Sequence, residues 1–473
     1  MFGTLVHKEV RAILLSPKFV ATFAVCSLLI LLSVYIGIRE YQAAVRQYQT
    51  ALQLNEQTIR QTPDLMRLQT KAFREPDPMQ IFVSGVTYDV GRWAPISTNT
   101  VPLLSGSTYA EDTIFAVFRV IDFAFIIQVV LSLFAILFTF DAVSGEREDG
   151  TLKLVFANAV PRATYLSAKC AGAWLGLAVP LAIPILLSLL MVMVAGVPLG
   201  SAQWMRLAAL GGLSFLLFTF FIMLGLLFST LTRRPSISFL LSLSAWVVLV
   251  MIIPRAGTAA AAQIARVPSA AEVASIRDGY AKERQDRFIK ELTASASQAG
   301  SCGGGALNTK TLDSLRNEAD RDIAQNDARV NEGVRNKRAV QERLAFSLAR
   351  VSPPAAFQLA AMTIAGSDPD LKDRYEEAAG VNREEFRKYI EKKSGEGGPQ
   401  GIRIMASSET GLKIDMPREM GAIDPAELPR FNPPKFGLGK TLAEIVIDVA
   451  VMLLGSILAF GGAFASFLRY DVR

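Results

Sequence analysis

The sequence contains few residues that could bind a metal or form disulfides. Its 473 residues include one histidine, His7, and three cysteines. Cys26, Cys170 and Cys302 are too widely spaced for a zinc motif or a disulfide framework. Charged residues are also scarce, at 19%, and the net charge is only +6. Basic loops beside a membrane explain that charge better than a nucleic acid partner does, so nucleic-acid binding and His-based metal or proton-relay sites are not expected.

No nucleotide-binding motif is complete. The nearest stretch runs from Gly437 to Thr441 and ends in Gly-Lys-Thr, as a phosphate-binding loop does. The first glycine of that motif would have to stand at position 434, which is Pro434, and no strand precedes it. We therefore expect a non-enzymatic chain that holds no cofactor, with any ATP and magnesium bound by a partner subunit.

Apolar residues, in contrast, make up 51% of the chain and gather in long runs. About 20 consecutive apolar residues are needed to cross a bilayer. The runs predict an all-α polytopic membrane protein with six transmembrane helices, at 18–39, 115–141, 168–195, 205–230, 236–254 and 441–468. Ahead of them, residues 1–17 have the spacing of an amphipathic helix that lies along the inner membrane surface. The first run ends in Arg39-Glu40 without a small-residue cleavage site, so it predicts a membrane helix rather than a signal peptide.

Two large polar inserts interrupt these runs, at 40–114 and 255–440. In the first insert, apolar residues near a seven-residue spacing predict that the first helix continues as a stalk. We expect irregular structure at residues 75–112. In the second, two amphipathic stretches around the Gly-rich residues 300–305 predict an antiparallel helical hairpin. The remaining predictions for this mainly helical insert are a helix from Ser352 through Ala365 at the outer membrane surface, a helix at 368–392, and a small β-hairpin around 408–411.

Basic residues near the ends of the runs predict the orientation. With six crossings they all fall on one side, which is then the cytoplasm: Lys8, Arg11, Lys18, Arg147, Lys153, Arg162, Lys169, Arg233, Arg234, Arg469 and Arg473. Both termini and residues 142–167 are then cytoplasmic, and both inserts are extracytoplasmic.

Two pairs of charged residues lie near the predicted outer ends of membrane helices. Arg119 and Asp122 stand about one turn apart, as do Glu444 and Asp448. Each pair is either a local interfacial pair or a polar lining of a translocation path, and the sequence leaves both alternatives open.

The cytoplasmic segment 142–167 carries the most distinctive pattern. An acidic cluster that includes Glu146 and Glu148 is followed by Gly150-Thr151, and then by Leu152, Val155 and Phe156 at i, i+3 and i+4. Acidic residues are unfavourable at a helix C-terminus because of the macrodipole. The cluster therefore predicts a docking element: a short helix in the membrane plane that is presented to a soluble partner.

The string Ser-Gly-Glu-Arg-Glu-Asp-Gly-Thr-Leu at 144–152, followed by Val160-Pro161-Arg162 and Lys169, resembles the coupling region of the permease subunits of type-2 ABC exporters. The resemblance implies two permease subunits, identical or different, and two ABC ATPase subunits in a bacterial inner membrane. It also implies that the ATPase contacts Glu146, Glu148, Gly150, Thr151, and the face formed by Leu152, Val155 and Phe156. The large outer inserts depart from typical members and place the chain in a large-insert subgroup with diverse substrates.

Three functions follow as hypotheses. The first is an ATP-driven exporter permease. The second is a mechanotransmission subunit, in which ATP hydrolysis in the partner moves the outer helices to act on a periplasmic protein. The third is an ion-coupled transporter or receptor, which clear inverted repeats would favour, although none is evident.

Overall fold

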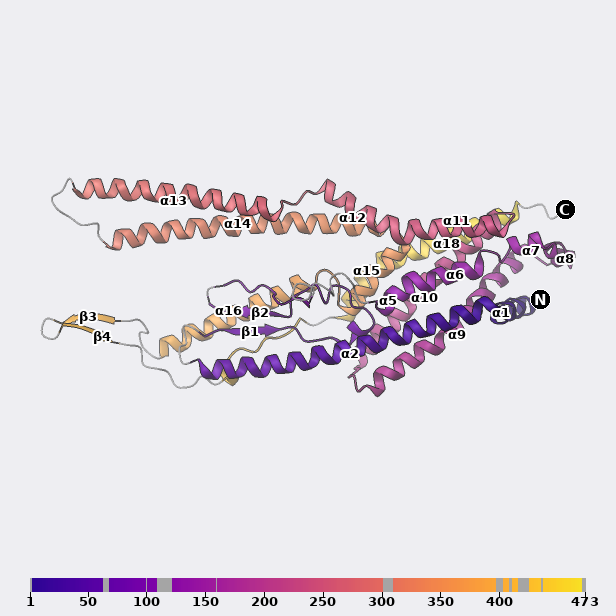
Figure 1. Cartoon of the computed structure of the whole chain (residues 1–473), viewed down its shortest axis with the longest axis horizontal. Coiled ribbons are helices and arrows are strands. Elements are labelled where there is room, and N and C mark those ends of the chain that lie inside the picture. The colour runs from indigo at the N-terminus through magenta and orange to yellow at the C-terminus, as the bar shows by residue number, and fades with distance from the viewer. Residues whose placement is uncertain are drawn as a thin grey trace. The chain divides into compact units, whose positions relative to one another are not determined.

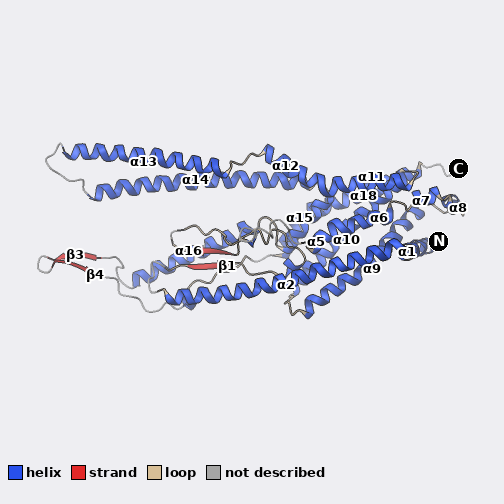
Figure 2. Cartoon of the chain, viewed as in Figure 1, coloured by secondary structure: helices blue, strands red, loops and turns tan. Residues whose placement is uncertain are grey.

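The computed structural model describes residues 2–62, 68–98, 100–108, 121–158, 160–300, 309–396, 403–407, 411–415, 425–434 and 437–469. The chain divides into two compact units. One comprises Met1–Val250 with Pro353–Arg473, and the other comprises Met251–Ser352. Helices dominate both units, and the described strands are short (Figure 2).

Six helical stretches are long and apolar enough to cross a membrane: Pro17–Gln61, Phe123–Glu148, Arg162–Val194, Ser201–Leu231, Pro235–Ile264 and Val446–Leu468. They confirm the prediction of an all-α polytopic membrane protein with six spans. Several helices extend beyond the predicted apolar runs because a helix can continue into polar residues outside the hydrocarbon. Residues 115–120 of the predicted second span lie outside the described residues.

The amphipathic helix α1 (Phe2–Leu14) ends just before the first span, α2 (Pro17–Gln61). Ser16 caps α2 by accepting a hydrogen bond from the Phe19 backbone N–H at 3.2 Å, and Pro17 occupies a first-turn position that needs no donor. The 45 residues of α2 form one uninterrupted helix that continues from the membrane span into the predicted stalk (Figure 1).

The second span is built from α5 (Phe123–Phe125), the π-helical segment η3 (Ile126–Leu131) and α6 (Ser132–Thr139). The third and fourth are α9 (Arg162–Val194) and α10 (Ser201–Leu231). The fifth begins with α11 (Pro235–Val247) and η4 (Val248–Ile252), and the last is α18 (Val446–Leu468), preceded by the short α17 (Leu438–Glu444). The core of this unit forms around α10, which packs against α6 and α18.

The prediction of irregular structure at 75–112 is wrong in part. Strand β1 (Thr70–Phe73) pairs antiparallel with β2 (Trp93–Ile96), and a 3-10 turn, η2 (Pro78–Ile81), lies between them. Pro95 and the shortness of the strands hide the alternation that identifies a strand in sequence. Helix α16 (Leu371–Glu396) packs on β2, so the two-stranded sheet is covered by a segment far away in the sequence.

Helix α15 (Pro353–Ala365) forms as expected from its Pro-Pro start, but it does not lie along a surface. It packs against both α10 and α18, and Phe357 is fully buried. Its small residues allow this close packing, and sequence hydropathy alone does not distinguish it from an interfacial helix.

The second unit contains long helices in the region of the predicted hairpin. Helix α12 (Ile253–Ile264) and helix α13 (Ala270–Gly300) both pack on α14 (Thr309–Ala349), and Figure 1 shows α13 and α14 side by side. Arg284 of α13 pairs with Asp322 of α14 at 2.7 Å.

The predicted β-hairpin also has its strands. Strand β3 (Arg403–Ser407) pairs antiparallel with β4 (Gly411–Asp415), with Arg403 opposite Asp415. The residues between the strands lie outside the described part of the chain.

Candidate coupling site

Two short helices, α7 (Ser144–Glu148) and α8 (Thr151–Ala157), form the segment that the sequence singles out. Gly150 joins them with a φ of 73°, a left-handed conformation that favours glycine because it has no Cβ. The backbone therefore turns at Gly150, between the end of α7 and the start of α8.

The apolar face of α8 points into the protein rather than toward solvent. Leu152 is 2% exposed. Phe156 contacts the rings of Tyr165 and Phe467, with centroid distances of 5.4 and 5.8 Å, and those two rings stack on each other. Together with partly buried Val155, these side chains anchor α8 on α9 and α18. Leu152 is thus buried, whereas Val155 and Phe156 are half-buried, and the contact of this face with an ATPase stays a prediction.

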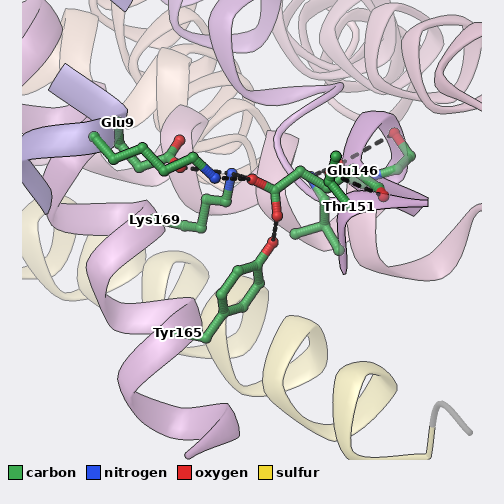
Figure 3. A network of polar contacts seen from close by, with 9 residues as sticks. Glu9, Glu146, Thr151, Tyr165 and Lys169 are labelled. Atoms are coloured by element: carbon green, nitrogen blue, oxygen red, sulfur yellow. Dashed lines mark hydrogen bonds and ion pairs between the residues drawn. The ribbon is translucent and has the colours of Figure 1, made fainter. Parts of the chain in front are cut away.

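Glu146 is the centre of a polar network (Figure 3). Its carboxylate accepts hydrogen bonds from the Lys8 and Lys169 ammonium groups, each at 2.9 Å to Oε1, and from the Tyr165 hydroxyl at 2.6 Å to Oε2. Only 14% of the side chain is exposed. Glu146 is thus an internal junction between α7, α1 and α9.

The network is charge-balanced. Lys169, whose side chain is 6% exposed, also pairs with Glu9 at 2.7 Å, so two acids face two lysines. Buried charges are tolerated only when they are paired and hydrogen-bonded. The arrangement depends on a close approach of α1 to α9: a Cβ added at Gly172 would lie 2.4 Å from the Cβ of Glu9.

Further polar contacts connect the segment to the end of α10. The backbone N–H groups of Val143 and Ser144 donate to the Ser229 hydroxyl at 2.9 and 3.0 Å. Arg147 donates to the carbonyls of Thr230 and Thr232 at 2.8 and 2.9 Å. Hydrogen bonds therefore connect α7 to the end of α10 as well as to α1 and α9.

The solvent-facing part of the segment is a mixed polar and apolar surface. Its exposed residues, which we name the α7–α8 surface, are Glu148, Asp149, Gly150, Thr151, Lys153, Leu154, Ala157 and Asn158. Leu154 is 68% exposed, and the Thr151 hydroxyl donates to the Glu146 carbonyl at 3.4 Å. Of the predicted contact residues, Glu148, Gly150 and Thr151 are therefore accessible, whereas Glu146 and Leu152 are not.

Of the four polar residues predicted near outer helix ends, the structure describes Asp122, Glu444 and Asp448. Asp122 caps the second span by accepting from the Phe125 N–H at 2.8 Å, and it also accepts from the Ser84 N–H and hydroxyl. Arg119 lies outside the described residues. Glu444 is exposed at the end of α17, whereas Asp448 is 1% exposed in α18, because the helix is interrupted between them at Ile445. A role in a translocation path stays a prediction for these residues.

An apolar cavity of about 320 Å³ lies among the membrane helices. Phe123, Leu181 and Leu210 are among its lining residues, with Ser132 and Ser188 as two of its few polar groups. In the part of the chain that the structure describes, no group of three or more His, Cys, Asp and Glu side chains could hold a metal ion.

Sequence reasoning missed the partners of Glu146. Lys169 belongs to the recognised pattern, and Tyr165 lies four residues earlier on the same helical face. The four-residue spacing of Tyr165 and Lys169 could therefore have identified both as neighbours on one helical face. The contacts of Lys8 and Glu9 could not be predicted from the sequence, because they depend on how α1 lies on α9.

Comparison with known proteins identifies one family. A search of curated proteins finds no match. A family described as "ABC-2 family transporter protein" matches residues 4–472, which is nearly the whole chain, both inserts included. With six membrane-spanning helices and this match, the chain belongs to the ABC-2 family of transporter proteins.

Proposed function

We propose that this chain is the permease subunit of an ATP-driven exporter and that the α7–α8 surface binds a separate cytoplasmic ABC ATPase. In this proposal, two permeases, identical or different, and two ATPases form the transporter in a bacterial inner membrane, with both permease termini in the cytoplasm and both inserts outside. ATP and magnesium are bound by the ATPase.

The observation that carries the proposal is the anchoring of α7 and α8 to several helices at once. Contacts from Glu146 reach α1 and α9, contacts from Arg147 reach the end of α10, and the ring of Phe156 reaches α18. A segment fixed in this way moves with those helices, so a force applied to its exposed side is transmitted to most of the bundle. An ordinary surface loop would lack such connections.

The exposed side has the composition of a small docking surface. Leu154 supplies an apolar centre, and the neighbouring Glu148, Asp149 and Lys153 supply a polar rim. Apolar anchors surrounded by polar residues carry most of the energy in protein interfaces. We therefore assign the ATPase contact to these exposed residues and an internal transmitting role to Glu146, Leu152, Val155 and Phe156.

The test is affinity purification of the tagged chain in mild detergent, followed by identification of the proteins recovered with it. We expect a stoichiometric ABC ATPase, and at least a tenfold lower recovery with Leu154→Asp, because a charge placed in an apolar contact is desolvated without a partner. Leu54→Asp is the matched control, since Leu54 is 57% exposed on the stalk part of α2. Equal ATPase recovery with both variants would refute the docking surface, and the absence of any ATPase from the wild-type preparation would refute the proposed function.

The mechanotransmission alternative is favoured by one observation. Helix α2 continues without a break through 45 residues, so a movement of its membrane part is transmitted to its outer part. A structure of the assembled complex separates the two functions: a continuous, substrate-sized passage between the two permeases supports export, and a closed interface supports mechanotransmission.

A further inference from the structure

A cavity of about 680 Å³ lies in the outer part of the larger unit. Its walls come from segments far apart in the sequence: Arg74 after β1, Gln80 in η2, Thr87, Ser367 after α15, and Tyr375 on α16. Gln80, Thr87, Ser367 and Tyr375 are all less than 9% exposed. This volume falls within the range of small-molecule sites, in which a few buried polar groups fix the ligand.

Arg74 is the unusual residue of this cavity. Its backbone N–H donates to the Arg92 carbonyl at 2.9 Å, and its Nη2 donates to the Thr87 carbonyl at 2.7 Å, so both its backbone and its side chain are held. Its Nε is buried and has no hydrogen-bond partner among the described residues. No ion pair links Arg74 to a carboxylate in the described part of the chain. The residue as a whole is half-buried, and a guanidinium largely withdrawn from water is normally paired with an acid.

The acidic residues of the cavity do not supply that partner. Asp77 accepts from the Met79 N–H at 2.9 Å and pairs with the buried Arg206 at 3.1 Å. Glu75 also lines the cavity, but its side chain is exposed. No carboxylate of the described residues therefore lies within ion-pair distance of Arg74, although Glu75 and Asp77 bring negative charge to the same cavity.

We propose that this cavity binds an oxyanion, a phosphate or carboxylate group, with the Arg74 guanidinium as its principal ligand. A guanidinium presents a planar fork of donors that matches the oxygens of these anions. The hydroxyl of Tyr375 and the amide of Gln80 are neutral groups on the same wall that can donate further hydrogen bonds. The anion belongs either to a free solute on the outer side or to a lipid headgroup.

Burial and nearby charges act on both proposed donors of this cavity. Burial holds the pKa of the Arg74 guanidinium below its usual value; Tyr375 opposes this effect, and the positive charge of Arg92 adds to it. Burial raises the pKa of the Tyr375 hydroxyl to about 12; Arg74 lowers it and the carboxylates of Asp77 and Glu75 add to the rise, so the hydroxyl is a protonated donor at neutral pH. An incoming anion would compensate the desolvated cation, which favours its binding.

The test uses the full chain in phosphatidylcholine nanodiscs, titrated with inorganic phosphate at constant ionic strength and followed by calorimetry. We expect saturable binding, and a dissociation constant raised about 10- to 100-fold by Arg74→Gln, because a charge-assisted hydrogen bond is lost. Arg46→Gln, at an exposed position of α2, removes the same charge and should leave the affinity unchanged. Arg74→Lys keeps the charge but loses the fork, so it should weaken binding severalfold, and it serves as the second variant if the glutamine variant does not fold.

A second arm identifies the source of the anion. Wild type and Arg74→Gln are placed in nanodiscs with and without phosphatidylglycerol, and the thermal unfolding midpoint is compared. A rise caused by phosphatidylglycerol in the wild type alone supports a lipid headgroup, whereas phosphate binding without that rise supports a free solute. If neither phosphate nor phosphatidylglycerol distinguishes the wild type from both Arg74 variants, the site is refuted. None of these outcomes depends on an ATPase, so they are independent of the proposed function.

Discussion

Replacing Glu146 by glutamine should destabilise the protein and disconnect the coupling segment from α1 and α9. The carboxylate is 14% exposed and accepts three hydrogen bonds, two of them from lysines. Breaking a buried ion pair by removing one partner costs about 3–5 kcal/mol. Two features lower this cost in the present case. Lys8 is 53% exposed, so its ion pair with Glu146 contributes only about 0–1 kcal/mol. Lys169 is still neutralised by Glu9 when Glu146 is replaced. We therefore expect a loss of about 2–3 kcal/mol.

The assay is equilibrium unfolding of the purified chain in mixed micelles, followed by circular dichroism. Glu148→Gln is the matched control, because it removes the same charge two residues away at an exposed position, where substitutions usually change stability by less than about 0.5 kcal/mol. A double-mutant cycle with Lys169→Met should give a coupling energy of about 1–3 kcal/mol.

Glu146→Gln should also change how the transporter functions. Glu146→Gln should keep the ATPase bound while reducing transport-coupled ATP hydrolysis, since the exposed contact is intact but its link to the bundle is weakened. Equal stability of Glu146→Gln and Glu148→Gln, together with a coupling energy near zero, would refute the reasoning that Glu146 is a buried junction.

Two further predictions concern other contacts of the larger unit. Gly172→Val should separate α1 from α9 and cost about 1–3 kcal/mol, because the added Cβ would lie 2.4 Å from the Cβ of Glu9; an unchanged unfolding midpoint would contradict this. Burial raises the pKa of the Asp368 carboxyl above its ordinary 3.8, although Arg374 donates to it at 3.1 Å. The folded state then binds the proton more tightly than the unfolded state, so this group's contribution to stability falls as the pH rises from about 3.8 through the raised pKa. Asp368→Asn should remove that part of the pH dependence, and an identical stability profile for wild type and variant would contradict the assignment.

The sequence by itself determined the class of the protein, its six spans and its helical inserts. Each of these follows from local patterns: apolar runs long enough for a bilayer, amphipathic stretches around a glycine-rich loop, and prolines at helix starts. The string from Ser144 to Leu152 also identified the segment that matters, because charge, glycine and apolar spacing within that segment are properties of neighbouring residues.

Only the tertiary structure decided what those residues contact. The apolar face of α8 could have faced a partner or the protein, and its spacing is the same in either case; the stacked rings of Tyr165 and Phe467 direct it inward. Glu146 became an internal junction because α1 approaches α9 at Gly172, and the cavity around Arg74 exists because α16 returns to cover β2. Such contacts join residues separated by tens to hundreds of positions. A local pattern specifies an element and the face it offers, whereas the packing of all the elements together decides what that face meets.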